Sequence, residues 1–196
     1  MGLRRIAALS LTLLFVFLAT PSSGRLARQP HIDGVNLRRG PHADLIVDFR
    51  VEGLRNRKIL ETLDSGLPVR FTYWVRVVRP RELRRDQIVA EVQIERALEK
   101  DNLKNRFHVT LSEGADAEEV ATLDAALQAM SQVEGVSVLP LDALGGRRPM
   151  VLMLKAQLQK FQLPFHLHYL FAFVSFWDVE TEWHSLPLPD SPNALP

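Results

Sequence analysis

Apolar and polar residues alternate along much of the chain, and this pattern predicts β-strands that bury one face. The clearest case runs from Val69 to Val77, where every second residue is apolar and either aromatic or β-branched. The pattern, in stronger or weaker form, predicts strands over residues 32–38, 45–51, 69–77, 88–95, 106–111, 136–141 and 151–158. Most connections between them are too short for parallel crossovers, so we expect a mainly antiparallel sheet.

A short helix is expected over residues 57–64. Asn56 stands where an N-cap residue is needed, because its side chain can accept a hydrogen bond from the first turn. Gly66 follows the helix at the position where glycine commonly ends one.

A longer helix is predicted over residues 116–134. Asp116 and Glu119 have the spacing of a capping box, and Gly135 is placed to close the helix. Apolar residues at helical spacing then define its inner face, which consists of Val120, Leu123, Leu127 and Met130.

The most unusual stretch of the sequence is aromatic-rich and covers residues 163–183. We expect a helix over 164–177 and then a strand over 179–184, although a strand-like alternation of the first part is the alternative. Its apolar run is too short to span a bilayer, so the stretch is a core or membrane-interfacial element. The candidate core or interface residues are Phe165, Tyr169, Phe173, Phe176, Trp177 and Trp183. The sequence therefore predicts an α+β fold with a mainly antiparallel sheet, curved or sandwich-like, packed by the 116–134 helix and the C-terminal aromatic helix.

Residues 1–24 have the layout of a secretory signal peptide. Arg4 and Arg5 precede an apolar run over 6–19, and small residues follow at 22–24. An uncleaved signal anchor is the alternative, because the cleavage site lacks the Ala-x-Ala form. Both interpretations predict an exported, periplasmic protein, which an uncleaved signal would tether to the inner membrane.

The length of 196 residues fits one domain of ordinary size. We expect a loose linker over 25–31, a single β-rich exported domain over 32–186 and a proline-rich tail over 187–196. An apolar content of 46% excludes disorder for most of the chain.

Charge and cysteine content narrow the classes of function. The 24 basic residues nearly balance the 23 acidic ones, so we expect no nucleic-acid partner. The chain has no cysteine, which excludes disulfides, thiolate metal sites and thiol nucleophiles and suits an oxidising periplasm. There is also no Gly-x-Ser-x-Gly motif and no glycine-rich phosphate loop, so no catalytic residue and no cofactor are expected.

Three motifs carry a resemblance to a known family: Asp64–Phe71, Asp101–Val109 and Phe173–Trp183. With them the chain resembles, over residues 32–186, a bacterial family of exported proteins described only as a domain of unknown function. The resemblance implies a single exported domain, and some members are encoded near a sensor histidine kinase, which implies a link to such a system. It supplies no catalytic residue.

One candidate contact site is a run of arginines that begins at the end of the predicted strand 69–77 and continues beyond it. We expect these residues at a hairpin tip that faces anionic lipid headgroups or an acidic partner. The alternative is an ordinary solvated turn. The run consists of Arg76, Arg79, Arg81, Arg84 and Arg85.

One candidate metal site combines histidines and glutamates near the C-terminus. Residues two apart share a face only on a strand, so the glutamates could converge there. Nitrogen and oxygen ligands of this kind could hold zinc or another divalent ion, and the alternative is a solvated polar face. The residues are His166, His168, Glu180, Glu182 and His184.

The leading functional hypothesis is a non-enzymatic interaction or binding module of the cell envelope. Its partner would be an envelope protein or the membrane surface, contacted through the arginines or the aromatic stretch. Two alternatives stay open: a metal-dependent periplasmic enzyme that uses the His/Glu group, and a carrier of a small apolar ligand or lipid.

Overall fold

The computed structural model describes residues 29–112, 115–144, 149–159, 179–189, 191 and 194–195. The expected signal segment 1–24 and the expected helix 164–177 lie outside these residues. In chain order the elements are β1 (His31–Arg39), β2 (Asp44–Glu52), α1 (Arg57–Asp64), β3 (Val69–Arg79), β4 (Gln87–Asp101), β5 (Arg106–Thr110), β6 (Glu118–Val120), α2 (Leu123–Ser131), β7 (Gln132–Pro140), η1 (Leu141–Leu144), β8 (Val151–Leu158) and β9 (His184–Pro187).

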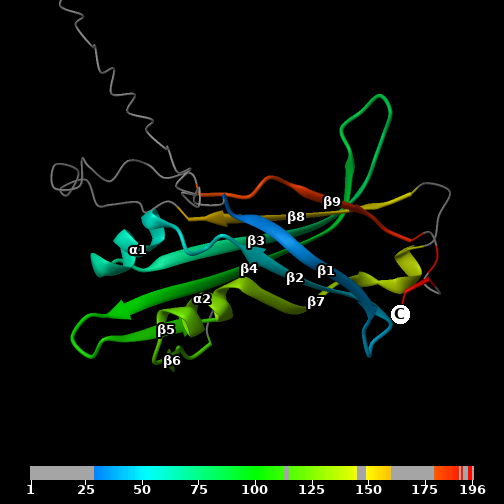
Figure 1. Ribbon diagram of the computed structural model, residues 1–196. Coiled ribbons are helices and arrows are strands. Elements are labelled where there is room, and N and C mark those ends of the chain that lie inside the picture. The colour runs from blue at the N-terminus through cyan, green and yellow to red at the C-terminus, as the bar shows by residue number, and fades with distance from the viewer. Residues whose placement is uncertain are drawn as a thin grey trace, which may run out of the picture.

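The described strands form two antiparallel sheets. The smaller sheet has the order β1-β2-β7, and the larger has the order β6-β5-β4-β3-β8-β9. Every neighbouring pair within them is antiparallel. Figure 1 shows the smaller sheet lying across the larger one. The predicted α+β fold with mainly antiparallel strands is confirmed.

Buried side chains of both sheets meet in a single core. Val47 of β2, Val75 of β3 and Leu154 of β8 are fully buried. The rings of Phe49 and Tyr73 approach to 6.2 Å between their centroids and join the two sheets. Aromatic contacts at this distance add to the stabilisation that burial alone gives. The predicted alternation of β2, β3 and β8 therefore marks the faces that the sheets turn toward each other.

Helix α1 forms where the sequence predicts it. The side chain of Asn56 accepts a hydrogen bond from the backbone N–H of Ile59 at 3.0 Å, and Ile59 and Leu63 are buried. Gly66 follows with φ +76°, a left-handed conformation that glycine adopts without strain.

Helix α2 is shorter than the predicted helix over 116–134, and that prediction is wrong at its start. Thr122 is the N-cap, and its hydroxyl accepts from the N–H of Ala125 at 3.2 Å. The capping-box pattern of Asp116 and Glu119 is not used, because β6 forms there and pairs with β5. Long-range strand pairing thus overrides the local helix signal.

The end of α2 also differs from the prediction, because Gly135 does not close the helix. The helix ends at Ser131, and β7 begins at the next residue with no connecting loop. Leu127 and Met130 are buried as the helical spacing predicts. Among the described residues, no helix combines the length and apolarity needed to cross a membrane.

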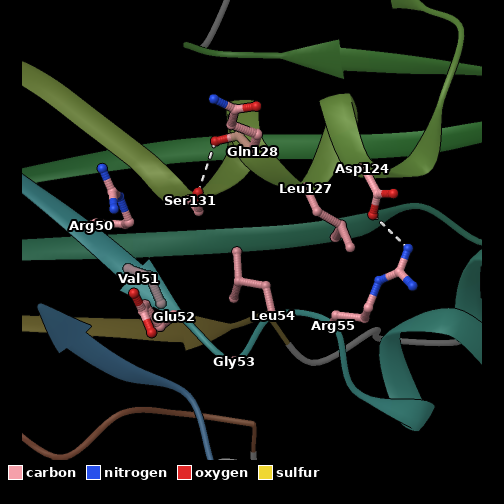
Figure 2. Close-up of a pocket in the computed structure, with 10 residues that line it drawn as sticks. All are labelled: Arg50, Val51, Glu52, Gly53, Leu54, Arg55, Asp124, Leu127, Gln128 and Ser131. Carbon is pink, nitrogen blue, oxygen red and sulfur yellow. Dashed lines mark hydrogen bonds and ion pairs between the residues drawn. The ribbon is translucent and has the colours of Figure 1, made fainter.

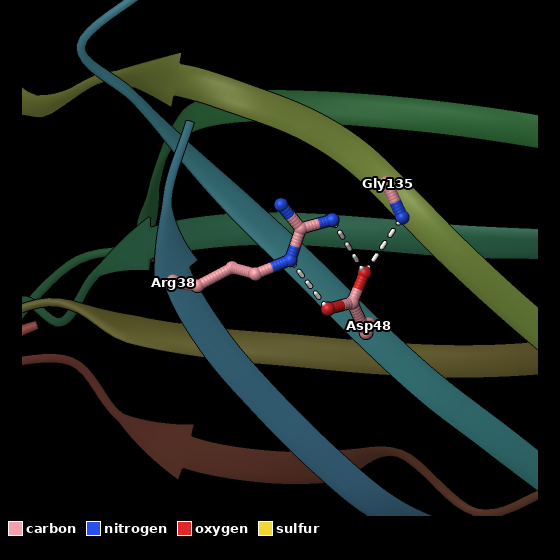
Figure 3. Close-up of polar contacts among 3 residues, drawn as sticks. All are labelled: Arg38, Asp48 and Gly135. Carbon is pink, nitrogen blue, oxygen red and sulfur yellow. Dashed lines mark hydrogen bonds and ion pairs between the residues drawn. The ribbon is translucent and has the colours of Figure 1, made fainter. Parts of the chain in front are cut away.

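Gly135 instead forms a bulge in β7. A register shift between β2 and β7 leaves Asp48 opposite both Glu134 and Gly135, and Gly135 has φ +73°. The carboxylate of Asp48 accepts from the N–H of Gly135 at 2.6 Å and from Arg38 of β1 at 2.8 and 3.3 Å (Figure 3). Asp48 therefore links all three strands of the smaller sheet.

The strand after the aromatic stretch starts later than predicted, at β9 rather than at 179. Glu180 makes only an isolated bridge with Gln157. The hydroxyl of Thr181 accepts from the N–H of Ala156 at 3.0 Å, in the place of a backbone carbonyl. This side-chain bond interrupts the ladder, so regular pairing with β8 resumes only at His184.

The two described residues that flank segment 160–178 lie beside the same strand end. The N–H of Leu158, the last residue of β8, donates to the carbonyl of Val179 at 2.8 Å. Further along, Leu188 is buried, and its N–H donates to the carbonyl of Met150 at 2.9 Å. Gln159 and Val179, the described residues on either side of segment 160–178, therefore both lie at the end of β8.

Candidate functional site

The connection between β3 and β4, residues 80–86, is called the β3–β4 tip here. Figure 1 shows it projecting beyond the rest of the fold. Leu83 in its middle is 96% exposed, and Arg81, Arg84 and Arg85 are exposed around it. Arg81 holds the base of the tip together, because its N–H donates to Asp86 at 3.2 Å and its guanidinium to Gln87 at 2.5 Å.

The predicted arginine group is divided, because two of its five members do not lie on the tip. Arg76 lies within β3 on the outer face of the larger sheet and forms an ion pair with Glu91 of β4. Its guanidinium lies 5.1 Å from the ring of Trp74 and 4.8 Å from the ring of Trp183. Arg79 donates to the sulfur of Met150 at 3.8 Å. Only Arg81, Arg84 and Arg85 remain as tip residues.

Trp183 is the one predicted aromatic candidate within the described residues. It is half-buried on the outer face, where Lys155 of β8 lies 5.8 Å from its ring. Lys155 also pairs with Glu180 at 2.9 Å. Trp183 is therefore held between cations that already have carboxylate partners. The other five candidates, Phe165, Tyr169, Phe173, Phe176 and Trp177, lie outside the described residues.

The described residues of the predicted metal site do not gather. Glu180 is engaged by Lys155, Glu182 is exposed, and His184 lies in β9 opposite Leu154. In the described part of the chain, no three His, Cys, Asp or Glu side chains are placed to hold a metal ion. His166 and His168 lie outside that part.

A shallow groove of about 260 Å³ lies between the end of β2 and helix α2 (Figure 2). Its floor is apolar and includes Val51, Leu54 and Leu127, while Arg55 and Asp124 form an ion pair at 2.5 Å at one end. The remaining lining residues are Arg50, Glu52, Gly53, Gln128 and Ser131. None of these lining residues is aromatic, so the groove contains no part of the aromatic stretch.

The serine at the groove is already engaged within its own helix. The hydroxyl of Ser131 donates to the carbonyl of Gln128 at 2.8 Å. A serine nucleophile needs an adjacent base to take its proton. No His lines the groove, so its geometry fits contact with a partner better than nucleophilic catalysis.

A family model matches residues 27–187, which is most of the chain and spans both sheets from β1 to the end of β9. The chain belongs to the family called Domain of unknown function (DUF4390). No curated protein and no solved structure matches it. The predicted membership of a family described only as a domain of unknown function is thereby confirmed. The DUF4390 match names no activity.

Two buried polar residues of the DUF4390 fold were not expected from the sequence to act together. Tyr73 donates from its hydroxyl to the carbonyl of Met130, and Arg96 donates to the carbonyls of Ala129, at 2.6 Å, and Gln132. All three acceptors lie where α2 ends and β7 begins. Helix ends leave such carbonyls without intrahelical partners, so Tyr73 and Arg96 cap the helix from the larger sheet.

Burial shapes the titration of this pair. Burial raises the pKa of the Tyr73 phenol, an effect that the charge of Arg96 opposes. Burial also lowers the pKa of Arg96, which the nearby Tyr73 and Glu134 partly offset. The sequence did contain a signal for Arg96. In a strand, every second residue lies on the same face, so Arg96 lies on the core-facing side with Val92 and Ile94.

Sequence reasoning also missed Leu83. The sequence around the tip reads Arg-Glu-Leu-Arg-Arg over residues 81–85, and the leucine interrupts an otherwise charged run. An exposed leucine among several arginines combines apolar and basic side chains at one turn. That interruption was the available signal.

Proposed function

We propose that this protein is a non-enzymatic binding module of the cell envelope that contacts an anionic membrane surface through the β3–β4 tip. One observation carries the proposal: Leu83 is 96% exposed at the tip, and Arg81, Arg84 and Arg85 surround it. Leu103 is equally exposed in the turn between β4 and β5, so it is the combination of an exposed leucine with three arginines that distinguishes the β3–β4 tip.

The chemistry of the tip suits the boundary between headgroups and acyl chains. Full burial of a leucine side chain contributes about 1.5–3 kcal/mol. Each arginine near an anionic lipid surface contributes about 1 kcal/mol. Asp86 is already engaged with the backbone of Arg81, which leaves Glu82 as the acidic residue that opposes the three arginines.

The tip is also placed to reach a surface. It is the turn of a hairpin whose strands pair along the full length of β3, so its base is rigid. Figure 1 shows that it projects from one end of the larger sheet, away from both helices. A membrane could therefore meet the tip before it met the rest of the fold.

A single fluorophore at the tip tests the proposal. The chain has no cysteine, so the full-length Leu83→Cys variant can be labelled with NBD at one site only. We expect its emission to shift to the blue with phosphatidylcholine vesicles that contain phosphatidylglycerol, and much less with pure phosphatidylcholine. Added salt should reverse the shift, because screening weakens the attraction. Adding Arg84→Gln and Arg85→Gln should weaken binding by about 2 kcal/mol, or about thirtyfold.

The matched control is NBD on Leu103→Cys. Leu103 is 98% exposed in the turn between β4 and β5, at the other end of β4. Equal responses at the two positions would contradict a tip-specific contact. An NBD shift at position 83 that depends neither on salt nor on lipid charge would contradict the role of the arginines. A shift that occurs only with an envelope protein fraction would indicate a protein partner in place of the membrane.

The envelope location rests on the layout of residues 1–24, and it has its own test. Intact-mass measurement of protein taken from the envelope is expected to show the loss of about 24 residues. A full-length mass in the membrane fraction would establish the anchor instead. A full-length mass in the cytosol would contradict both forms of the proposal.

A further inference from the structure

Part of the edge of strand β4 that faces away from β3 pairs with no other described strand. β3 pairs with β4 from Gln87 to Leu98, whereas β5 pairs with it only from Ala97 to Asp101. On the side away from β3, residues 90–94 therefore have no strand partner among the described residues, and we call them the open edge. Backbone groups on such an edge are a template for pairing with another strand.

The open edge also carries apolar side chains that are only partly covered. Ala90, Val92 and Ile94 pack against the core, yet each stays partly exposed. Natural edge strands commonly avoid association by means of lysine, proline or a bulge. The open edge contains neither lysine nor proline, and the bulge at Val89 lies just outside it. Its one charged residue, Glu91, is paired with Arg76 of β3.

We propose that the open edge pairs with the same edge of a second copy of this chain, antiparallel and about a twofold axis at Val92. Two larger sheets then become one continuous sheet. In this register Val92 faces its own counterpart and Ala90 faces Ile94, so apolar side chains meet on the inner face. On the outer face Glu91 faces Gln93, whose amide can donate to the carboxylate.

Charge selects this register over its neighbours. An axis at Glu91 would place two Glu91 carboxylates directly opposite each other, and an axis at Gln93 would place Glu91 opposite Glu95. Like charges in these positions are destabilising. With the axis at Val92, both carboxylates keep the partners they have: Glu91 stays paired with Arg76, and Glu95 accepts from Gln93 at 3.1 Å.

The β3–β4 tip leaves room for the second copy. Val89 is an extra residue of β4 relative to β3, because Ala90 pairs with Val77 and Ile88 pairs with Val78. A bulge bends the strand pair that contains it. Figure 1 shows the tip turning away from the line of β3 and β4. It therefore does not extend along the path that a second β4 would follow.

Single-cysteine crosslinking of the full-length chain tests the pairing. Residues directly opposite each other in antiparallel strands have Cβ atoms about 4.5–5.5 Å apart, close to the separation in a disulfide. With copper phenanthroline as oxidant, we expect Val92→Cys to shift from the mass of one chain to the mass of two, and reductant to reverse the shift. The control is Leu103→Cys, which is more exposed but far from the axis, and it should stay largely monomeric.

Sedimentation equilibrium gives a second, independent measurement. We expect the unmodified chain to dimerise with concentration and Val92→Lys to be monomeric, with circular dichroism confirming that the variant is folded. The proposal is overturned if Val92→Cys crosslinks no more than Leu103→Cys. It is also overturned if the thiol at position 92 is captured by a different envelope protein, because a foreign strand would then be the occupant.

Discussion

Replacing Arg96 with methionine is expected to lower the free energy of unfolding by about 3–5 kcal/mol. Arg96 is only 9% exposed, and its guanidinium donates hydrogen bonds to the carbonyls of Ala129 and Gln132. Hydrogen bonds from a charged donor contribute about 1.5–3 kcal/mol each, and a buried carbonyl left alone is a further penalty. Methionine fills most of the volume, so the loss reports the polar contacts rather than a cavity. Urea unfolding followed by circular dichroism measures it.

Two variants bracket this result. Tyr73→Phe removes a single hydrogen bond, to the carbonyl of Met130, and should cost about 1–2 kcal/mol. Arg50→Met removes an exposed arginine and should stay within about 0.5 kcal/mol of the parent. If Arg96→Met proves no more harmful than Arg50→Met, the end of α2 does not depend on the larger sheet.

The second large effect is expected at Asp48. Asp48→Ala removes hydrogen bonds to Arg38 and to the backbone of Gly135, and it should lower the free energy of unfolding by about 2–3 kcal/mol. The Gly135 bulge then keeps its left-handed backbone without the carboxylate that binds its N–H. Thermal unfolding at neutral pH measures the loss.

The same residue makes stability depend on acid. Burial acts to raise the pKa of Asp48, but hydrogen bonds from Arg38 and Gly135 outweigh it, so the pKa lies below the ordinary value of 3.8. A lowered pKa in the folded state stabilises the fold above the ordinary value, and that contribution is lost as pH falls through the lowered one. The parent should therefore lose stability below about pH 4, and Asp48→Asn should flatten this part of the profile.

Arg38→Gln separates the two partners of Asp48. It leaves the bond from Gly135 in place, so it should cost less than Asp48→Ala and flatten the acid profile only in part. If Asp48→Asn leaves the pH dependence of stability unchanged, other carboxylates are responsible for the loss of stability in acid. Asp44 is the first to examine, because its hydrogen bond from Ser137 also lowers its pKa.

The strands were predictable because their signal is local. In β2, β3 and β8 the apolar residues of the alternating pattern are the ones that lie on the buried face of the sheet. Helix α2 was misplaced because Asp116 and Glu119 match a helix start by spacing alone, whereas residues 118–120 gain more from pairing with β5. That gain depends on a strand that comes close only after folding.

The candidate site was predictable in the same partial way. The sequence located the arginines of the tip, and alternation placed Arg76 beside Trp74 on one face. The sequence could not predict that Trp183 also contacts Arg76, because the two residues are distant in sequence. They come together only when β8 pairs with β3 and with β9. The metal, carrier and aromatic-segment hypotheses concern residues 163–178 above all and stay predictions.

The direct junction of α2 and β7 has a consequence for how homologous chains can vary in length. Ser131 ends the helix and Gln132 begins the strand, so an inserted or deleted residue has no loop to absorb it. It would turn every side chain of β7 to the opposite face. Insertions and deletions should therefore be nearly absent at this junction.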